Sequence, residues 1–303
     1  MCRAWHLQYY IRYATRQDGQ LASYPRRIYR DPVAKPQDIL LRDHSPFFVI
    51  GGPCVIESLE LCLEVADSVK KTCEKLGLAY IFKASFDKAN RSSKDTFRGP
   101  GLEGGLIILE KVKQEIGVPV LTDIHEPHQA AVAAKIVDVL QVPAFLARQT
   151  DLLLACGQTG RWINVKKGQF MSPAEMGNAV DKIKSTGNDK IILTERGTFF
   201  GYNRLVNDFT GLAVMKEFGH PVCFDITHST QQPAAQGNQS GGNPKYSPML
   251  ARAAMASCVD GLFLECHPDP KNAKSDAATM LDIKNVETIL RQCRAIAELR
   301  IEW

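Results

Sequence analysis

The stretch AYIFKASFDKANRSSKDTFRGPG (residues 79–101) joins a strand-like run to a highly charged loop. Its first residues, AYIF, have the aromatic and β-branched character of a buried strand. Lys83, Lys88 and Arg91 then follow within nine residues, accompanied by a single acid and several amide and hydroxyl donors. Such donors suit a phosphate or carboxylate ligand. A solvated basic loop is the alternative, but ligands of α/β proteins bind where buried strands end, which favours an anion receptor.

Runs of the same kind recur along the chain. Eight are strand-like: FFVIGG (47–52), AYIFKAS (79–85), PVLTDI (119–124), DVLQVPA (138–144), WINVKK (162–167), KIILTER (190–196), PVCFDIT (221–227) and GLFLECH (261–267). Each is followed by one helix-compatible segment: Leu59–Leu76, Glu103–Ile116, Gln129–Ile136, Thr150–Thr159, Ala174–Ser185, Phe209–Phe218, Ser247–Ser257 and Val286–Leu299. This alternation, with nearly continuous apolar strands, predicts an α/β fold whose parallel sheet closes into a (β/α)8 TIM barrel.

An open, doubly wound sheet is the alternative for such an alternation. No GxGxxG follows the first strand-like run, which disfavours a dinucleotide-binding sheet. A bend at His44–Pro46 suggests a short N-terminal hairpin leading into the first strand. We therefore predict one catalytic barrel over residues 38–303. Residues 1–37 are rich in Arg and Tyr, lack Glu, and form an N-terminal extension of unknown role.

Composition excludes several classes of protein. The net charge of +4 is too small to indicate a nucleic-acid partner, and no apolar run approaches the roughly 18 residues that span a membrane. No secretory signal is apparent, so a cytoplasmic location is expected; a cleaved transit peptide within the Arg-rich start is the alternative. The nine cysteines are scattered and odd in number, which indicates reduced thiols.

Charged side chains gather at the carboxyl ends of the predicted strands, where the catalytic face of a barrel lies. Four cations from three strands form a first group: Lys83, Lys88, Lys166 and Arg196. A single lysine there could be an ordinary surface residue, but four cations on one rim predict a small, highly anionic substrate. Asp123 and His125 follow the third strand, and Asp123, His125 and Glu195 are candidates for proton transfer or for orienting the substrate.

A second group offers ligands for a metal ion. It consists of one thiol, one imidazole and two carboxylates from distant parts of the chain: Cys54, His228, Glu265 and Asp276. Mixed sulfur, nitrogen and oxygen ligands suit a divalent ion such as Zn²⁺, Fe²⁺, Mn²⁺ or Co²⁺. No short CxxC or HExxH motif is present among them, so a buried structural Cys54 is the alternative from the residues alone.

Several long motifs are similar to those of the 3-deoxy-D-manno-octulosonate-8-phosphate synthase family. They are GGPCVIES (51–58), KASFDKANRSS (83–93), RGPGLEGG (98–105), TDIHEP (122–127), QVPAFLARQTDLL (141–153), NVKKGQFMSP (164–173), ERGTFFGYN (195–203), FDITHS (224–229) and ECHPDP (265–270). The resemblance spans about residues 46–299 and leaves the first 37 unsupported. It implies a TIM barrel, usually a homotetramer, that condenses phosphoenolpyruvate with arabinose 5-phosphate for the inner-core sugar of lipopolysaccharide.

The resemblance also implies roles for individual residues. Phosphoenolpyruvate would be held by Lys83, Ser85, Lys88, Gln141, Lys166, Arg196 and the backbone near Ala144. Arabinose 5-phosphate would be held by Asn90, Arg91, Ser92 and Asp123, and Arg148 is a further expected substrate-binding residue. In the family the Asn-Arg-Ser segment reaches into a neighbouring subunit's site.

Metal use divides the family, because metal-dependent members have Cys at the end of the first strand and metal-independent members have Asn. Cys54 therefore implies the metal-dependent type, with His228, Glu265 and Asp276 as the other ligands. The nearest rival enzyme is 3-deoxy-D-arabino-heptulosonate-7-phosphate synthase, which typically has a Pro-Arg-Thr acceptor loop where this chain has KANRSS (88–93). A non-catalytic barrel that binds a phosphorylated metabolite is the remaining alternative.

Overall fold

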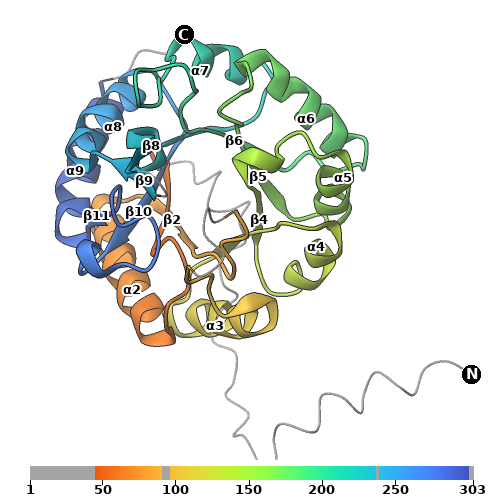
Figure 1. The fold of residues 1–303 in the computed structure, drawn as a ribbon, viewed down its shortest axis with the longest axis horizontal. Helices are drawn as coiled ribbons and strands as arrows, with labels where there is room; N and C mark the ends of the chain where they lie inside the picture. Colours follow the sequence, from red (N-terminus) through yellow and green to blue (C-terminus); the bar gives the residue numbers. More distant parts are fainter. Residues whose placement is uncertain (1–44, 91–95, 237–238, 300–303) are drawn as a thin grey trace, which may run out of the picture. The chain divides into compact units, whose positions relative to one another are not determined.

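A closed parallel barrel forms the centre of the computed structural model, which describes residues 45–90, 96–236 and 239–299 (Figure 1). Its eight strands are β1 (Phe48–Gly52), β2 (Ala79–Lys83), β3 (Val120–Asp123), β4 (Val139–Val142), β5 (Trp162–Lys166), β6 (Ile191–Glu195), β7 (Val222–Asp225) and β10 (Gly261–His267). Each pairs with the next in parallel, and β1 pairs with β10 over five residues, from Phe48 with Gly261 to Gly52 with Glu265. This closure confirms the predicted TIM barrel and excludes the open sheet.

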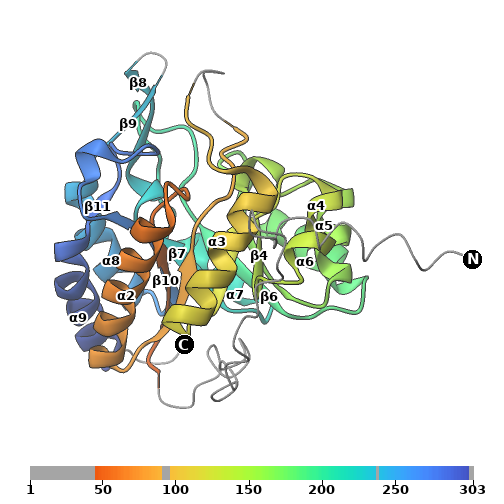
Figure 2. The ribbon, with the colours of Figure 1, turned by 90° about the horizontal axis from the view of Figure 1, so that it is seen from below.

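Helices surround the barrel, as Figures 1 and 2 show. They are α2 (Leu59–Leu76), α3 (Gly101–Ile116), α4 (Pro127–Ala133), α5 (Thr150–Gln158), α6 (Met176–Lys184), α7 (Thr210–Lys216), α8 (Ser247–Ala256) and α9 (Val286–Ala297). Helix α2 illustrates why they begin and end where they do. The Ser58 hydroxyl accepts a hydrogen bond from the Leu61 amide at its start, and Gly77 takes a left-handed conformation at its end.

Burial on both faces explains why the strands read as continuous apolar runs. Alternate residues point inward and fill the barrel, among them Phe48, Ile50 and Phe263. Their neighbours, such as Val49 and Leu262, point outward into a second core beneath the helices. Charged residues are therefore confined to the strand ends.

The same clamp occurs twice at the amino-terminal end of the barrel. Asp138, just before β4, accepts a hydrogen bond from the Val120 amide at 3.0 Å and one from Lys113 at 2.6 Å. Asp260, just before β10, accepts from the Val222 amide at 2.8 Å and from Lys216 at 3.2 Å. Each clamp satisfies the first amide of one strand and ties it to the next strand and to a helix.

Two features were absent from the sequence-based prediction. The first is an antiparallel hairpin of β8 (Gln231–Gln236) and β9 (Gln239–Gly242), which projects from the carboxyl-terminal end of the barrel (Figure 2). The second is β11 (Leu281–Asp282), which pairs with the end of β10. The N-terminal extension and most of the expected N-terminal hairpin lie outside the described residues. Within the described part of the chain, no helix is long and apolar enough to cross a membrane.

Candidate active site

The carboxyl ends of the parallel strands bring acids and bases from distant segments onto one face. Lys83, at the end of β2, is buried and donates hydrogen bonds to Glu265 Oε1 at 2.6 Å and to the Cys54 carbonyl at 2.8 Å. Burial alone would raise the pKa of the Glu265 carboxyl, but the nearby charges of Lys83, His228 and Lys88 lower it to about 2. Glu265 is therefore an ionised carboxylate held against an ammonium group.

A second buried pair crosses the barrel between β5 and β7. The Lys166 ammonium donates to Asp225 Oδ2 and lies 3.4 Å from the centre of the Phe263 ring. His228 Nδ1 contacts the same carboxylate oxygen at 2.7 Å. Burial opposes ionisation of Asp225, yet His228 and Lys166 hold its pKa well below the usual value. The Asp225 carboxylate thus contacts both Lys166, a member of the cationic group, and His228, a predicted metal ligand.

The other two predicted cations lie beside these pairs. The Arg196 side chain is buried, and its Nη2 donates to Gln231 Oε1 at the base of the β8–β9 hairpin at 2.6 Å. Among the described residues, its Nη1 has no hydrogen-bond partner. Burial disfavours the charged form of Lys88, but the surrounding carboxylates of Glu265, Asp123 and Asp276 raise its pKa well above the ordinary value. The Lys88 side chain therefore stays cationic in the cluster.

Three of the predicted metal ligands form one compact group. The sulfur of Cys54 and carboxylate oxygens of Glu265 and Asp276 all lie within 4.8 Å of one another. Cys54 Sγ is 3.3 Å from Asp276 Oδ2, and His228 Nε2 is 3.6 Å from an oxygen of each carboxylate. The structure brings all four residues together.

These distances fit a divalent cation. Ligand atoms around a tetrahedral metal with bonds of 2.0–2.3 Å lie about 3.3–3.8 Å apart. Burial, together with Asp276 and Glu265, raises the pKa of the Cys54 thiol well above its ordinary value. A thiol binds metal as the thiolate, so metal binding at Cys54 would release a proton.

Predicted polar groups without a net positive charge line the same face. Asp123 Oδ2 lies 3.2 Å from His125 Nε2, and the pKa of this carboxyl is strongly lowered: burial opposes ionisation, but His125, Lys83 and Lys88 outweigh it. Within the described ranges, neither Asp123 Oδ1 nor the buried Ser85 hydroxyl has a hydrogen-bond partner. Two side-chain oxygens on this face are thus available to a ligand.

Gln141 also lies buried at this face, where its Oε1 accepts from Asn164 Nδ2 at 2.9 Å. Asn164 Oδ1 in turn accepts from the Thr194 hydroxyl at 2.5 Å. The Gln141 amide is therefore held in a fixed orientation by two neighbouring strands.

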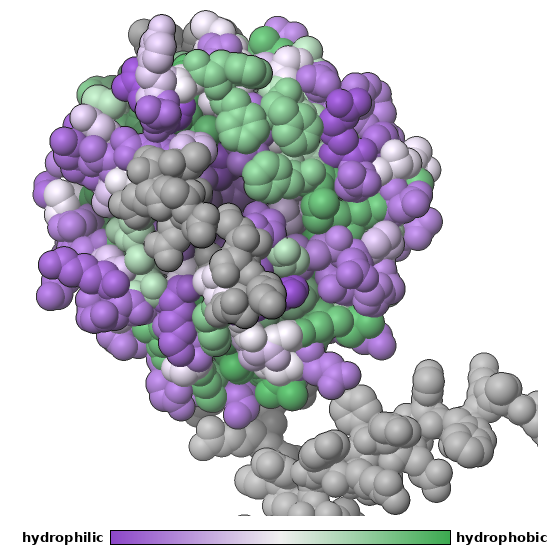
Figure 3. All heavy atoms as spheres, viewed as in Figure 1, coloured by the Kyte–Doolittle hydropathy of each residue, from purple (hydrophilic) through white to green (hydrophobic). Residues whose placement is uncertain are grey.

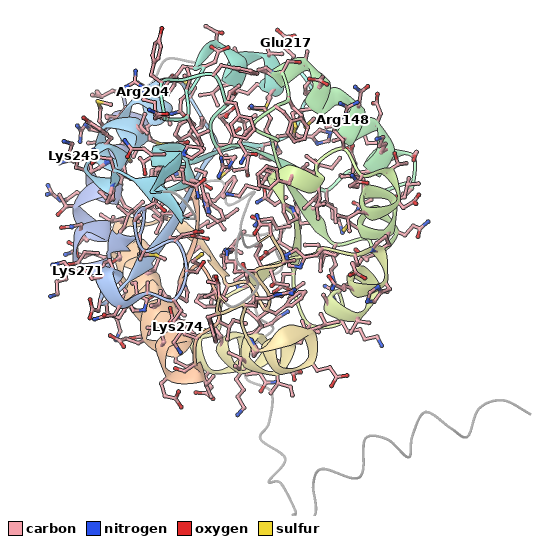
Figure 4. The ribbon with its side chains drawn as sticks, in the orientation of Figure 1. Arg148, Arg204, Glu217, Lys245, Lys271 and Lys274 are labelled. Carbon is pink, nitrogen blue, oxygen red and sulfur yellow. The ribbon has the colours of Figure 1, made fainter. Side chains whose placement is uncertain are left out.

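Some predicted substrate-binding residues lie apart from this cluster. The Arg148 side chain is 66% exposed, with Nη1 3.9 Å from Glu175 Oε1, and Figure 4 shows it toward the outer rim near α5 and α6. Ala144 begins a short 3₁₀ helix after β4, and Asn90 is exposed in the loop after β2. Arg91 and Ser92 fall outside the described residues. The substrate contacts of these residues stay predictions.

Comparison with known proteins identifies the family. The family model for the DAHP synthetase I family matches residues 30–300, which include every strand of the barrel. The chain belongs to this family. The match covers the cationic group and the four potential metal ligands.

Curated family members are similar over nearly their whole length. A 2-dehydro-3-deoxyphosphooctonate aldolase from Cyanothece sp. is 56% identical over 259 residues, covering 86% of this chain and 95% of that protein. Proteins with the same name from Protochlamydia amoebophila and Thioalkalivibrio sulfidiphilus are 49% and 56% identical over 263 and 245 residues. These alignments cover 87% and 81% of this chain, and 96% and 88% of the two relatives.

Sequence reasoning missed some residues that organise this family member's site. Asp225 lies near the end of the strand-like run PVCFDIT (221–227), but its contacts with Lys166 and His228 were not foreseen. Lys167 is fully buried, lies 3.5 Å from Glu195 Oε2, and donates to the Thr198 hydroxyl at 3.0 Å. Side-chain alternation in β5 carried a usable signal, because Lys166 and Lys167 must point to opposite sides of the barrel wall.

Glu195, the partner of Lys167, is bonded to the backbone turn that follows β6. Its Oε1 accepts hydrogen bonds from the Arg196 and Gly197 amides at 2.9 and 2.6 Å. These bonds hold the turn that carries Arg196. Glu195, considered above for proton transfer, supports the backbone in this structure.

Proposed function

We propose that this protein is a 3-deoxy-D-manno-octulosonate-8-phosphate synthase, the activity for which 2-dehydro-3-deoxyphosphooctonate aldolase is another name. One observation carries the proposal: relatives with that name are about half identical to this chain across nearly their full length. The enzyme joins phosphoenolpyruvate, arabinose 5-phosphate and water into the eight-carbon sugar phosphate and inorganic phosphate. This reaction belongs to the synthesis of the lipopolysaccharide inner core.

The cationic group suits the phosphoenolpyruvate anion. Lys83, Lys166 and Arg196 come from three strands and are buried on one face, where a low dielectric strengthens their attraction for phosphate and carboxylate. Arg196 Nη1, which has no partner among the described residues, is a candidate to donate a hydrogen bond to a phosphate or carboxylate oxygen. We propose that Ser85, Lys88 and Gln141 complete this subsite, with the backbone near Ala144.

Arabinose 5-phosphate would bind beside it. Asp123, whose Oδ1 has no partner within the described part of the chain, is placed to accept a hydrogen bond from a sugar hydroxyl. We propose that Asn90, Arg91, Ser92 and Arg148 hold its phosphate, from this subunit or a neighbouring one. Two anions must approach each other in the site, so positioning and charge neutralisation supply much of the rate enhancement.

The reaction forms one carbon–carbon bond and releases phosphate. The methylene carbon of phosphoenolpyruvate attacks the aldehyde carbon of the pentose, whose oxygen gains a proton and becomes a hydroxyl. Water adds at the carbon that bears the phosphate, and that carbon then loses inorganic phosphate as its hydroxyl becomes the keto group. Lys83, Lys166 and Arg196 stabilise the negative charge, and we propose that His125 acts in proton transfer or in orienting Asp123.

We further propose that this enzyme is of the metal-dependent type. Cys54, His228, Glu265 and Asp276 would hold one divalent ion, Zn²⁺, Fe²⁺, Mn²⁺ or Co²⁺. Such an ion, when bound, polarises an aldehyde oxygen or activates a water molecule. The compact group of Cys54, Glu265 and Asp276 supports the proposal, as do the distances of 3.6 Å from His228 Nε2 to both carboxylates.

A homotetramer is the proposed assembly. Phe145, Phe170 and Phe200 follow three consecutive strands on the site-bearing face and are 49%, 43% and 91% exposed. Figure 3 shows a group of hydrophobic side chains on this face. Apolar groups gathered in this way commonly mark a protein interface. Light scattering on the purified protein tests the assembly. The cytoplasmic location expected from the sequence stays a prediction.

A phosphate-release assay tests the reaction. Phosphoenolpyruvate would be supplied with arabinose 5-phosphate or erythrose 4-phosphate, before and after chelation and after metal is restored. We expect phosphate release only with the pentose, lost on chelation and recovered with metal. Activity with erythrose 4-phosphate instead would indicate the heptulosonate enzyme, whereas saturable binding without release from either acceptor would indicate a binding protein. Pentose activity in protein shown to lack metal would contradict metal dependence.

A further inference from the structure

Asp225 connects the two halves of the site through a single oxygen. Its Oδ2 contacts His228 Nδ1 at 2.7 Å and also accepts from the Lys166 ammonium. Its Oδ1 accepts from the Thr227 amide, the Thr227 hydroxyl and the His228 amide at 2.9–3.0 Å. All of these contacts are made by a carboxylate with no exposure to solvent. Asp225 therefore has little freedom to move away from either partner.

The chemistry of Asp225 fixes the tautomer of His228. An ionised carboxylate can only accept hydrogen bonds, so the proton of the neutral imidazole lies on Nδ1. Nε2 then carries no proton, so its lone pair can bind a metal ion. It lies 3.6 Å from oxygens of Glu265 and Asp276. On the other side of Asp225, the Lys166 ammonium group attracts both the Asp225 carboxylate and any anion bound beside it. Asp225 thus influences the cation site and the anion site at once.

We propose that Asp225 is a positioning residue that couples the two sites, so that a divalent cation held through His228 and phosphoenolpyruvate held through Lys166 raise each other's affinity. The proposal rests on the proposed function, because it takes those two ligands from it. A cation at Nε2 polarises the imidazole and strengthens its Nδ1–H bond to Asp225. The carboxylate then attracts Lys166 less, and the ammonium charge acts more strongly on the anion.

The contact between Lys83 and Glu265 should couple the two ligands in the same direction. Glu265 accepts from Lys83 through Oε1 and faces His228 through Oε2. A cation bound by Glu265 competes for the carboxylate charge that Lys83 otherwise neutralises. Both connections therefore predict positive coupling, which must be reciprocal between the two ligands.

Binding measurements on the whole protein test the coupling without relying on turnover. Co²⁺ serves as the metal probe because its absorption spectrum reports thiolate coordination by Cys54. The Kd of phosphoenolpyruvate is measured by calorimetry with and without saturating Co²⁺, and the Kd of Co²⁺ with and without phosphoenolpyruvate. We expect each ligand to lower the Kd of the other by the same factor, about tenfold, within the usual range of such couplings.

Asp225→Asn should break the connection while keeping the size of the side chain. We expect its Kd for Co²⁺ to rise about 10–100-fold, as for the loss of other groups that orient metal-binding histidines. The effect of Co²⁺ on phosphoenolpyruvate binding should fall well below tenfold, because only the connection through Lys83 and Glu265 remains. Asp260→Asn is the matched control, because Asp260 clamps the opposite end of the same strand, and it should keep the full coupling.

Lys166→Met interrupts the same connection from the other side and leaves the other hydrogen bonds of Asp225 in place. At concentrations where calorimetry shows phosphoenolpyruvate to bind this variant, the ligand should lower the Kd of Co²⁺ by much less than tenfold, because only the connection through Lys83 and Glu265 remains. Wild-type protein that binds the two ligands independently would refute the coupling but not the proposed function. A tenfold effect of one ligand on the Kd of the other that survives in either variant would do the same. Wild-type protein that binds no phosphoenolpyruvate would refute the proposed function as well.

Discussion

Buried charges at the strand ends are each matched to a specific partner, so single substitutions should have effects that differ by residue. Lys83 and Lys166 face carboxylates in the site, whereas Lys167 faces Glu195 on the other side of the strand. The first two are expected to matter for ligand binding. Lys167 is expected to matter for stability, because its partner holds a backbone turn.

Cys54→Ala tests the role of Cys54 in the proposed metal site. We expect the variant to lose metal and to reduce kcat by at least about 100-fold, since a bound metal supplies several kcal/mol of charge stabilisation. The fold should persist, with a loss of about 1 kcal/mol in unfolding free energy that is typical of point substitutions. Metal analysis, turnover and urea unfolding measure the three quantities. Cys156→Ala, which removes a buried thiol from α5, is the control and should remain active. A fully active, metal-free Cys54→Ala enzyme would contradict the proposed metal site.

Lys167→Ala tests the support beneath Arg196. The substitution leaves the Glu195 carboxylate buried without its cation, which typically costs about 3–5 kcal/mol. Urea unfolding should show this loss. Lys190→Ala, at a half-buried lysine that donates to the Gly160 carbonyl through an exposed hydrogen bond, should change the unfolding free energy by less than about 0.5 kcal/mol. Equal stability of the two variants would mean that the Lys167–Glu195 contact contributes little.

At the scale of strands, β1 and β2 are in close backbone contact beside the site. A Cβ atom added at Gly52 would lie 1.9 Å from the Lys83 carbonyl oxygen, so this position accepts glycine alone. Gly51, its neighbour, would place a Cβ 3.3 Å from the Leu264 side chain, which can shift. The close contact fixes the spacing between Cys54 and Lys83.

Gly52→Ala should therefore damage both stability and catalysis. Forcing β1 from β2 is an overpacking change, expected to cost about 1–3 kcal/mol in unfolding free energy. Because Cys54 and Lys83 move apart, kcat/KM should fall by more than Gly51→Ala reduces it. Thermal unfolding and steady-state kinetics on the pair of variants measure this. Similar values for the two would show that the strands separate without disturbing the site.

The sequence allowed the eight barrel strands and the helices between them to be predicted, because strands buried on both faces are continuously apolar and are separated by polar segments. It did not allow the β8–β9 hairpin to be predicted. That segment, rich in Gln and Gly, lacks the alternation that marks a strand, and backbone pairing defines it. Strand ends could likewise be predicted to carry the site. The sharing of Asp225 by Lys166 and His228 could not, since it depends on distances across the barrel.

The whole molecule should lose stability in mildly acidic solution through His220. This buried imidazole precedes β7, and burial lowers its pKa below the ordinary 6.5, with Asp189 only partly opposing the shift. Below pH 6.5 the unfolded chain therefore takes up a proton that the folded protein resists. The contribution of His220 to the unfolding free energy should fall as the pH drops from 7 through 6.5, until the lower pKa of the folded state is passed.

Urea unfolding at several pH values measures this dependence. His220→Gln should flatten the curve in this range, because the titrating group is gone. His128→Gln is the control, since the His128 side chain is 70% exposed and should leave the pH dependence unchanged. Identical curves for wild type and His220→Gln would assign the acid sensitivity to other groups.

Pairing of β1 with β10 also sets the order of events during synthesis. The ribosome makes β1 first among the barrel strands and β10 last, so the ring cannot close until nearly the whole chain has emerged. Cys54 follows β1 and Glu265 lies in β10, opposite Gly52 in the register. The two strands at the barrel seam thus carry or precede two of the proposed metal ligands. A chain released before β10 would have neither a closed barrel nor the complete set of proposed ligands.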